Sequence, residues 1–175
     1  MGHVAFFFLG AGFMLVETKA ITEMGLTFGN TWHVIGIVII AILTMAYLAN
    51  LVVQWWKIEG AIIPYLLLMG SLGLGLWVAG QGGFSSTTGG RIATAAVLTC
   101  PMFFSGMVFS TLLKRADNIS GVMAVNLIGA MLGGILEYNS MYFGFHFLYI
   151  LGLGLYAVAF LTSLRRAPAT APATA

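Results

Sequence analysis

Charged side chains are scarce in this chain of 175 residues. Five acidic and seven basic residues make up 7% of the chain, whereas a soluble domain typically carries about 25%. Hydrophobic residues make up 60% of the chain, and the mean hydropathy is +1.01. A water-soluble fold could not bury so much apolar surface, so the shortage of charge predicts a protein whose solvent is lipid.

Cysteine and functional motifs are equally scarce. The single cysteine, Cys100, excludes an internal disulfide and a cysteine-based zinc or iron–sulfur cage. A net charge of +2 and the lack of basic runs interleaved with aromatics exclude a nucleic-acid groove. No GxGxxG motif, Ser-His-Asp arrangement or metal-ligand spacing is evident, so the sequence predicts neither an enzyme nor a metal site.

Long apolar runs dominate what is present, and a membrane-spanning helix needs about 20 such residues. Six segments qualify: Val4–Thr27, Trp32–Trp55, Ala61–Gly80, Ile92–Leu113, Ser120–Tyr138 and Phe143–Leu164. The sequence therefore predicts an all-α integral membrane protein with six transmembrane helices over residues 1–166. Residues 167–175 alternate Ala, Pro and Thr, which predicts a disordered tail.

The basic residues outside the spans indicate an orientation. With the N-terminus in the cytoplasm, the outer side holds only Arg91, and the cytoplasmic side holds Lys57, Lys114, Arg115, Arg165 and Arg166. This asymmetry follows the positive-inside rule and predicts that both termini are cytoplasmic. All four tryptophans fall near span ends, where an aromatic belt would place them.

The stretch "FMLVETKA" (13–20) puts charges inside the first span. An ionised side chain at mid-bilayer costs roughly 2.5–3.5 kcal/mol on insertion scales, so something must offset that cost. Lys19 and Glu23 are four residues apart and share one helix face, where they can pair. Glu17 faces about 200° away from Lys19 and needs its own partner or a proton.

Further polar residues are expected at similar depths. A cluster in the outer half is predicted from these residues: Lys19, Glu23, His33, Arg91, Glu137 and His146. Asn50 and Asn126 lie nearer the cytoplasmic side and are candidates for hydrogen bonds between helices. Two interpretations stay open: the groups pair and fix helix order, or they line a site for an ion, a proton or a small solute.

His33 and His146 lie at matched depth, as a pair of haem or chlorophyll ligands would. No accompanying motif supports a pigment, and interfacial histidines satisfied by water are the simpler interpretation. We therefore predict no cofactor beyond lipid contacts.

Small residues recur within the fifth span. Gly129 and Gly133 form a GxxxG pair, and Gly134 follows Ala130 at the same spacing. Small residues at this spacing allow two helices in lipid to approach closely, so this face predicts a helix–helix contact. The pattern does not say whether the partner helix belongs to the same chain.

Several stretches together resemble the membrane region of bacterial spermidine-synthase-like proteins. They are "FFFLGAGFMLVETKAITEMGLTFGNTW" (6–32), "NTWHVIGIVIIAILTMAYLANLVV" (30–53), "MFFSGMVFSTLLKR" (102–115) and "NLIGAMLGGILEYNSMYFG" (126–144). The resemblance implies a bacterial cytoplasmic membrane and a six-span layout similar to half of a major-facilitator bundle. It also implies that Glu17, Thr18, Lys19 and Glu137 occupy the family's characteristic polar positions.

That family joins its membrane helices to an aminopropyltransferase-like or methyltransferase-like soluble domain, and this chain has no such segment. Polyamine synthesis therefore does not carry over. The sequence favours a non-catalytic membrane subunit or anchor module that contacts other membrane subunits or a second copy. The alternative is an oligomeric carrier or half-carrier for a small solute or an amine-type cation. Six short spans with small loops leave little room for a gated pathway in one chain, which favours the subunit.

Overall fold

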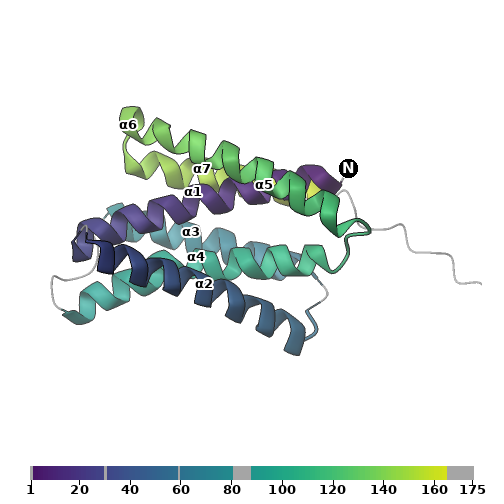
Figure 1. The fold of residues 1–175 in the computed structure, drawn as a ribbon, viewed down its shortest axis with the longest axis horizontal. Coiled ribbons are helices and arrows are strands. Elements are labelled where there is room, and N and C mark those ends of the chain that lie inside the picture. Colours follow the sequence, from purple (N-terminus) through teal and green to yellow (C-terminus); the bar gives the residue numbers. More distant parts are fainter. Residues whose placement is uncertain (1, 30, 59, 81–87, 165–175) are drawn as a thin grey trace, which may run out of the picture.

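The computed structural model describes residues 2–29, 31–58, 60–80 and 88–164, and every regular element in these ranges is helical (Figure 1). The long helices are α1 (Gly2–Phe28), α2 (Trp32–Trp55), α3 (Ile62–Gly80), α4 (Thr88–Leu113), α5 (Ile119–Leu136) and α7 (Phe145–Leu164). A 3-10 turn, η1 (Glu137–Asn139), and the short α6 (Ser140–Phe143) join α5 to α7. The predicted all-α bundle is confirmed.

Helix length and composition support a protein that crosses a membrane several times. Within the described ranges, five helices are long and apolar enough to span a bilayer, and α3 contributes a shorter apolar helix over Ile62–Val78. The outward surface is apolar as well: Ile37, Ile40 and Leu43 of α2 are all more than half exposed. Such a surface would be costly in water and is compatible with acyl chains.

The helix ends differ from the predicted spans where polar residues extend a helix. α4 begins at Thr88 instead of Ile92, and residues expected to form the connection before the last span form η1 and α6. Hydropathy marks where lipid contact ends, whereas backbone hydrogen bonds decide where a helix ends. Thr94 belongs to the first turns of α4, and its hydroxyl donates to the carbonyl of Gly90 at 2.9 Å.

Caps and glycines set the connections between helices. The Thr31 side chain accepts from the amide of Val34 at the start of α2, and Asn118 accepts from the amide of Gly121 at the start of α5. Gly144 has φ +80° between α6 and α7, in the left-handed region that favours glycine. The chain can therefore reverse at this end of the bundle.

Helix α1 lies at the centre of the packing. It packs mainly against α5 and α7 and also touches α4 and α2, while α4 packs against α2 and α3. Figure 1 shows the start of α1 and the α2–α3 and α4–α5 connections at one end of the bundle. The end of α1, the start of α2, the end of α3, the start of α4 and α6 lie at the other end, as antiparallel crossings require.

The packing pattern relates two groups of three helices. When α1, α2 and α3 are matched with α4, α5 and α7, the α1–α5 contact corresponds to α4–α2, and α1–α7 corresponds to α4–α3. The α3–α7 and α1–α4 contacts correspond to themselves, whereas the α1–α2 contact has no comparable α4–α5 counterpart among the described residues. Because α1 and α4 run in opposite directions in Figure 1, this arrangement has the form of an inverted repeat.

Candidate functional site

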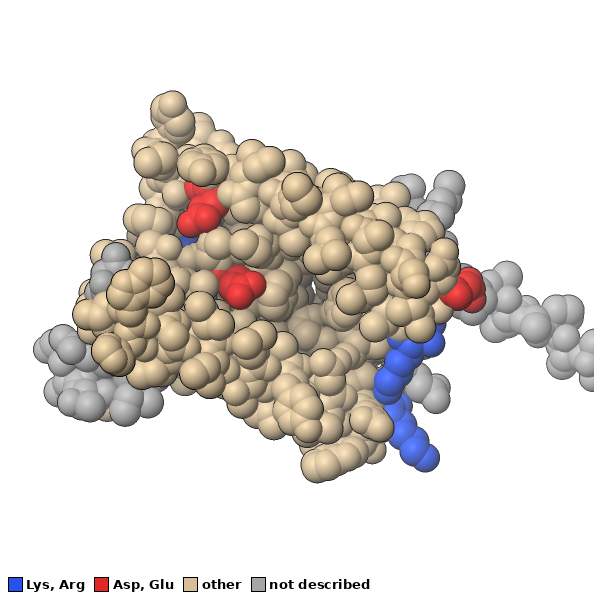
Figure 2. All heavy atoms as spheres, viewed as in Figure 1, with Lys and Arg blue, Asp and Glu red and all other residues tan. Residues whose placement is uncertain are grey.

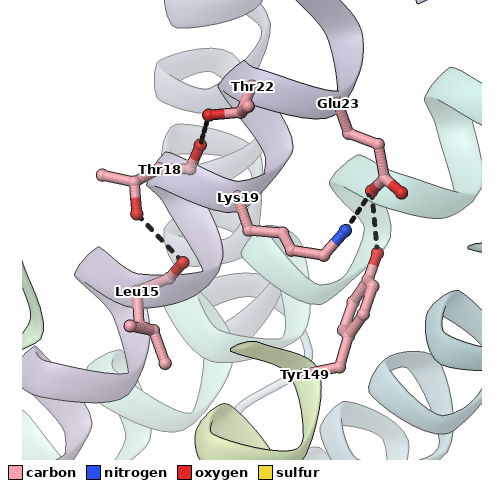
Figure 3. Close-up of polar contacts among 6 residues, drawn as sticks. All are labelled: Leu15, Thr18, Lys19, Thr22, Glu23 and Tyr149. Atoms are coloured by element: carbon pink, nitrogen blue, oxygen red, sulfur yellow. Dashed lines mark hydrogen bonds and ion pairs between the residues drawn. The ribbon is translucent and has the colours of Figure 1, made fainter. Parts of the chain in front are cut away.

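The charged pair of the first span is satisfied inside the bundle (Figure 3). Lys19 Nζ lies 2.7 Å from Glu23 Oε2, and the Tyr149 hydroxyl of α7 donates to the same oxygen at 3.2 Å. The ammonium also lies 4.2 Å from the centroid of the Tyr149 ring, a favourable cation–π position. The side chain of Lys19 is 3% exposed and that of Glu23 is 24% exposed, so a buried cation is neutralised at the edge of the interior.

The threonines beside this pair bond to their own helix. The Thr18 hydroxyl donates to the carbonyls of Met14 and Leu15 at 3.0 and 3.1 Å, and the Thr22 hydroxyl donates to the Thr18 carbonyl at 2.9 Å. Figure 3 shows the bonds from Thr18 to Leu15 and from Thr22 to Thr18. Both donors are thereby satisfied within α1, as is typical of threonine in apolar surroundings.

Glu17 is the exception among the charged groups of α1. Its side chain is half-buried, and no hydrogen bond or ion pair joins its carboxylate to any residue that the structure describes. The apolar part of α1 runs from His3 to Leu26, so Glu17 lies only about 4 Å past its middle at 1.5 Å per residue. A carboxyl group at mid-depth therefore has no hydrogen-bond or ion-pair partner within the described part of this chain.

A second polar contact crosses the core between α4 and α7. The hydroxyls of Ser105 and Tyr156 lie 2.8 Å apart, and both residues are buried. The ring of Tyr156 packs on Gly12 of α1, where a Cβ atom would lie 3.0 Å from the ring carbons. Nearby, the Tyr65 hydroxyl of α3 is buried beside Ser163 of α7.

Sequence reasoning did not single out these tyrosines. Tyr149 and Tyr156 are seven residues apart, which places both on one face of α7. A tyrosine inside an apolar span usually finds a hydrogen-bond partner, so this spacing was a usable signal for a polar face toward α1 and α4.

The two asparagines behave differently. Asn50 of α2 hydrogen-bonds Ser110 of α4, a contact between helices of the kind predicted. Asn126 of α5 is half-buried beside Gly10 of α1, where a Cβ atom would overlap the Asn126 carbonyl oxygen. Asn126 thus lies at a close helix crossing, with no side-chain hydrogen bond to a described residue.

The other residues predicted for the outer cluster are His33, Arg91, Glu137 and His146. His33 and His146 are exposed near the starts of α2 and α7, and Glu137 is half-buried in η1. The side chain of Arg91 and the tail 167–175 lie outside the described residues. The described residues hold no group of three or more His, Cys, Asp or Glu placed for a metal ion. The expectation of no cofactor beyond lipid contacts stays a prediction.

The small residues of α5 separate into two kinds. A Cβ atom at Gly129 would overlap the Phe7 carbonyl of α1, and one at Gly133 would overlap the Ala11 carbonyl. At Gly134 a Cβ atom would meet nothing within 4 Å. The close face therefore consists of Gly129 and Gly133, and its partner is α1 of the same chain.

No family model matches the chain, and comparisons with curated proteins and with solved structures give no match. The resemblance to spermidine-synthase-like membrane regions therefore stays a prediction from sequence.

Proposed function

We propose that this protein is a non-catalytic membrane subunit, and that the Glu17 side of α1 packs against another membrane chain, either a different subunit or a second copy. The observation that supports this proposal is the half-buried Glu17 carboxyl group, which has no hydrogen-bond or ion-pair partner among the described residues. Acyl chains cannot hydrogen-bond a carboxyl group, so a protein or water neighbour is required at that depth.

The other charges of α1 support a structural role over a ligand site. Lys19, Glu23 and Tyr149 satisfy one another, and a self-neutralised group of this kind needs no bound ion. Such pairs hold helices in register, because separating them would leave a buried charge without compensation. Glu17 is then the polar group of α1 that a partner would complete.

We also propose a bacterial cytoplasmic membrane with both termini in the cytoplasm. Three described basic side chains, those of Lys57, Lys114 and Arg115, lie at the end where α1 begins. The positive-inside rule assigns that end to the cytoplasm.

The test is copurification from native membranes after mild solubilisation, followed by mass spectrometry. We expect the tagged protein to bring down a stoichiometric partner or to form a defined oligomer. The Glu17→Leu variant should lose that association, because an apolar side chain cannot complete the polar contact. Glu137→Gln is the matched control, since it removes a carboxylate at the end of the bundle and should leave the association intact.

Two outcomes would reject the proposal that this protein is a membrane subunit. One is a monodisperse monomer of the parent protein that binds nothing, and the other is an unchanged association in Glu17→Leu. Thermal stability of each variant in detergent separates lost association from lost folding.

A carrier is the second candidate, and the inverted arrangement of the two helix triplets favours it. Transporters built from inverted repeats bind solutes near the bilayer midplane, which is the depth of Glu17. Uptake of small amines into proteoliposomes by the parent protein, lost in Glu17→Gln, would support the carrier. Absence of uptake in the parent protein would reject it.

A further inference from the structure

A basic pocket lies at the end of the bundle where α2 leads to α3 and α4 leads to α5. It has a volume of about 390 Å³ and is lined by Lys57, Ile58, Thr111, Lys114 and Arg115. Figure 2 shows the basic side chains of this face gathered at that end. Among the basic side chains that the structure describes, Lys19 alone lies elsewhere.

Part of this pocket is held in place by bonds to the helices. Lys114 Nζ donates to the carbonyl of Val53 at 2.9 Å, which ties the end of α4 to the end of α2. Thr111 is 1% exposed, and its hydroxyl donates to the carbonyl of Met107 at 2.7 Å. The cationic lining therefore belongs to two connected helix ends and does not depend on a single loop.

The neighbouring surface indicates what kind of anion would fit. Trp55 and Trp56 are 73% and 75% exposed at the end of α2, and Ile58 gives the pocket an apolar wall. Exposed tryptophans at a span end typically mark the headgroup level of the bilayer. Among the residues that the structure describes, the lining contains three cationic residues and no acidic one; Asp117, on the same connection as Arg115, is not part of it.

From this arrangement we infer that the pocket binds the phosphate headgroup of an anionic phospholipid, with the acyl chains lying along the exposed apolar face of α2. The positive-inside rule accounts for basic residues on this side of the membrane in general. In this protein, basic residues from two separate connections, α2–α3 and α4–α5, line one pocket, where they can bind a single headgroup together. The inference is independent of the Glu17 contact and of the subunit proposal.

The test measures quenching of tryptophan fluorescence by lipids brominated near the headgroup, with the full chain in bilayers of defined composition. Trp32 and Trp77 lie toward the opposite end, so the Trp32→Phe/Trp77→Phe background leaves Trp55 and Trp56 as reporters. We expect brominated phosphatidylglycerol to quench at lower mole fraction than brominated phosphatidylcholine.

Removing one of these charges should weaken the preference for phosphatidylglycerol. Lys57→Gln and Arg115→Gln should each lower the relative affinity for phosphatidylglycerol by about fivefold, the change expected for one basic side chain at a membrane surface. Arg91→Gln is the matched control, because Arg91 lies in the first turn of α4 at the opposite end, and it should leave the preference unchanged. Lys114 is not substituted in this test, because its hydrogen bond to the Val53 carbonyl supports the fold.

Three results would overturn the inference. They are equal quenching by the two lipids, an unchanged preference in both Lys57→Gln and Arg115→Gln, and complete displacement by millimolar inorganic phosphate. The last result would assign the pocket to a soluble anion instead of a lipid. Melting temperatures of the variants, compared with the parent protein, identify any that lose the lipid by unfolding.

Discussion

At the scale of single residues, the group formed by Lys19, Glu23 and Tyr149 explains how a nearly charge-free chain tolerates ions inside a span. Lys19 is almost fully buried and meets a carboxylate and an aromatic ring at once. Removing Glu23 should lower the stability of the fold, because it leaves the buried Lys19 charge without a partner.

We expect Glu23→Gln to lower the free energy of unfolding by about 3 kcal/mol, the lower end of the range for broken buried pairs, since Glu23 is 24% exposed. The double variant Lys19→Met/Glu23→Gln should lose less, because it leaves no unpaired cation. Unfolding in mixed micelles with increasing denaturing detergent measures both. A double variant less stable than Glu23→Gln alone would contradict this account.

At the scale of helices, the α1–α5 crossing depends on two glycines that let the backbones touch. The Phe7 and Ala11 carbonyls of α1 occupy the space that side chains at Gly129 and Gly133 would need. Backbone atoms cannot move aside as a flexible side chain can, so a larger residue must push the helices apart.

We expect Gly133→Leu to destabilise the protein by about 1–3 kcal/mol, the usual cost of overpacking, or more if α5 separates from α1. Gly134→Leu is the matched control at the neighbouring position, where the added side chain meets open space, and it should change stability little. Thermal unfolding of both variants in the same detergent provides the comparison. Equal destabilisation would mean that the crossing does not depend on Gly133.

At the scale of the whole molecule, the long helices that the structure describes run antiparallel, so a multi-pass arrangement places the two ends of the bundle on opposite sides of the membrane. Lys57 lies at one end, and Tyr142, which is 88% exposed, lies at the end that carries α6. A reagent that cannot cross the bilayer should therefore reach these positions from different sides.

In a Cys100→Ala background, we expect Lys57→Cys to react with a membrane-impermeant maleimide only in inverted vesicles. Tyr142→Cys should react only in spheroplasts, in which the outer face of the cytoplasmic membrane is accessible to the reagent. Labelling of both positions from one side would contradict the number of crossings. If Lys57→Cys reacts from outside and Tyr142→Cys from the cytoplasmic side, the number of crossings is supported but the proposed orientation is reversed.

The sequence by itself determined the features that depend on solvent and on the period of a helix. Low charge and long apolar runs required helices in lipid, because only a helix satisfies every backbone group within one segment. The spacing of Lys19 and Glu23 placed them on one face, since residues four apart are neighbours on any α-helix.

The tertiary structure alone decided which helices meet and therefore which polar groups find partners. In lipid, an apolar helix face can turn toward acyl chains or toward another helix at similar cost, so hydrophobicity cannot identify the buried faces. That is why the sequence did not distinguish Gly133, which packs on α1, from Gly134, where an added Cβ atom would meet nothing within 4 Å. It is also why the contact of Tyr149 with Glu23, 126 positions apart in the chain, emerged only from the packed bundle.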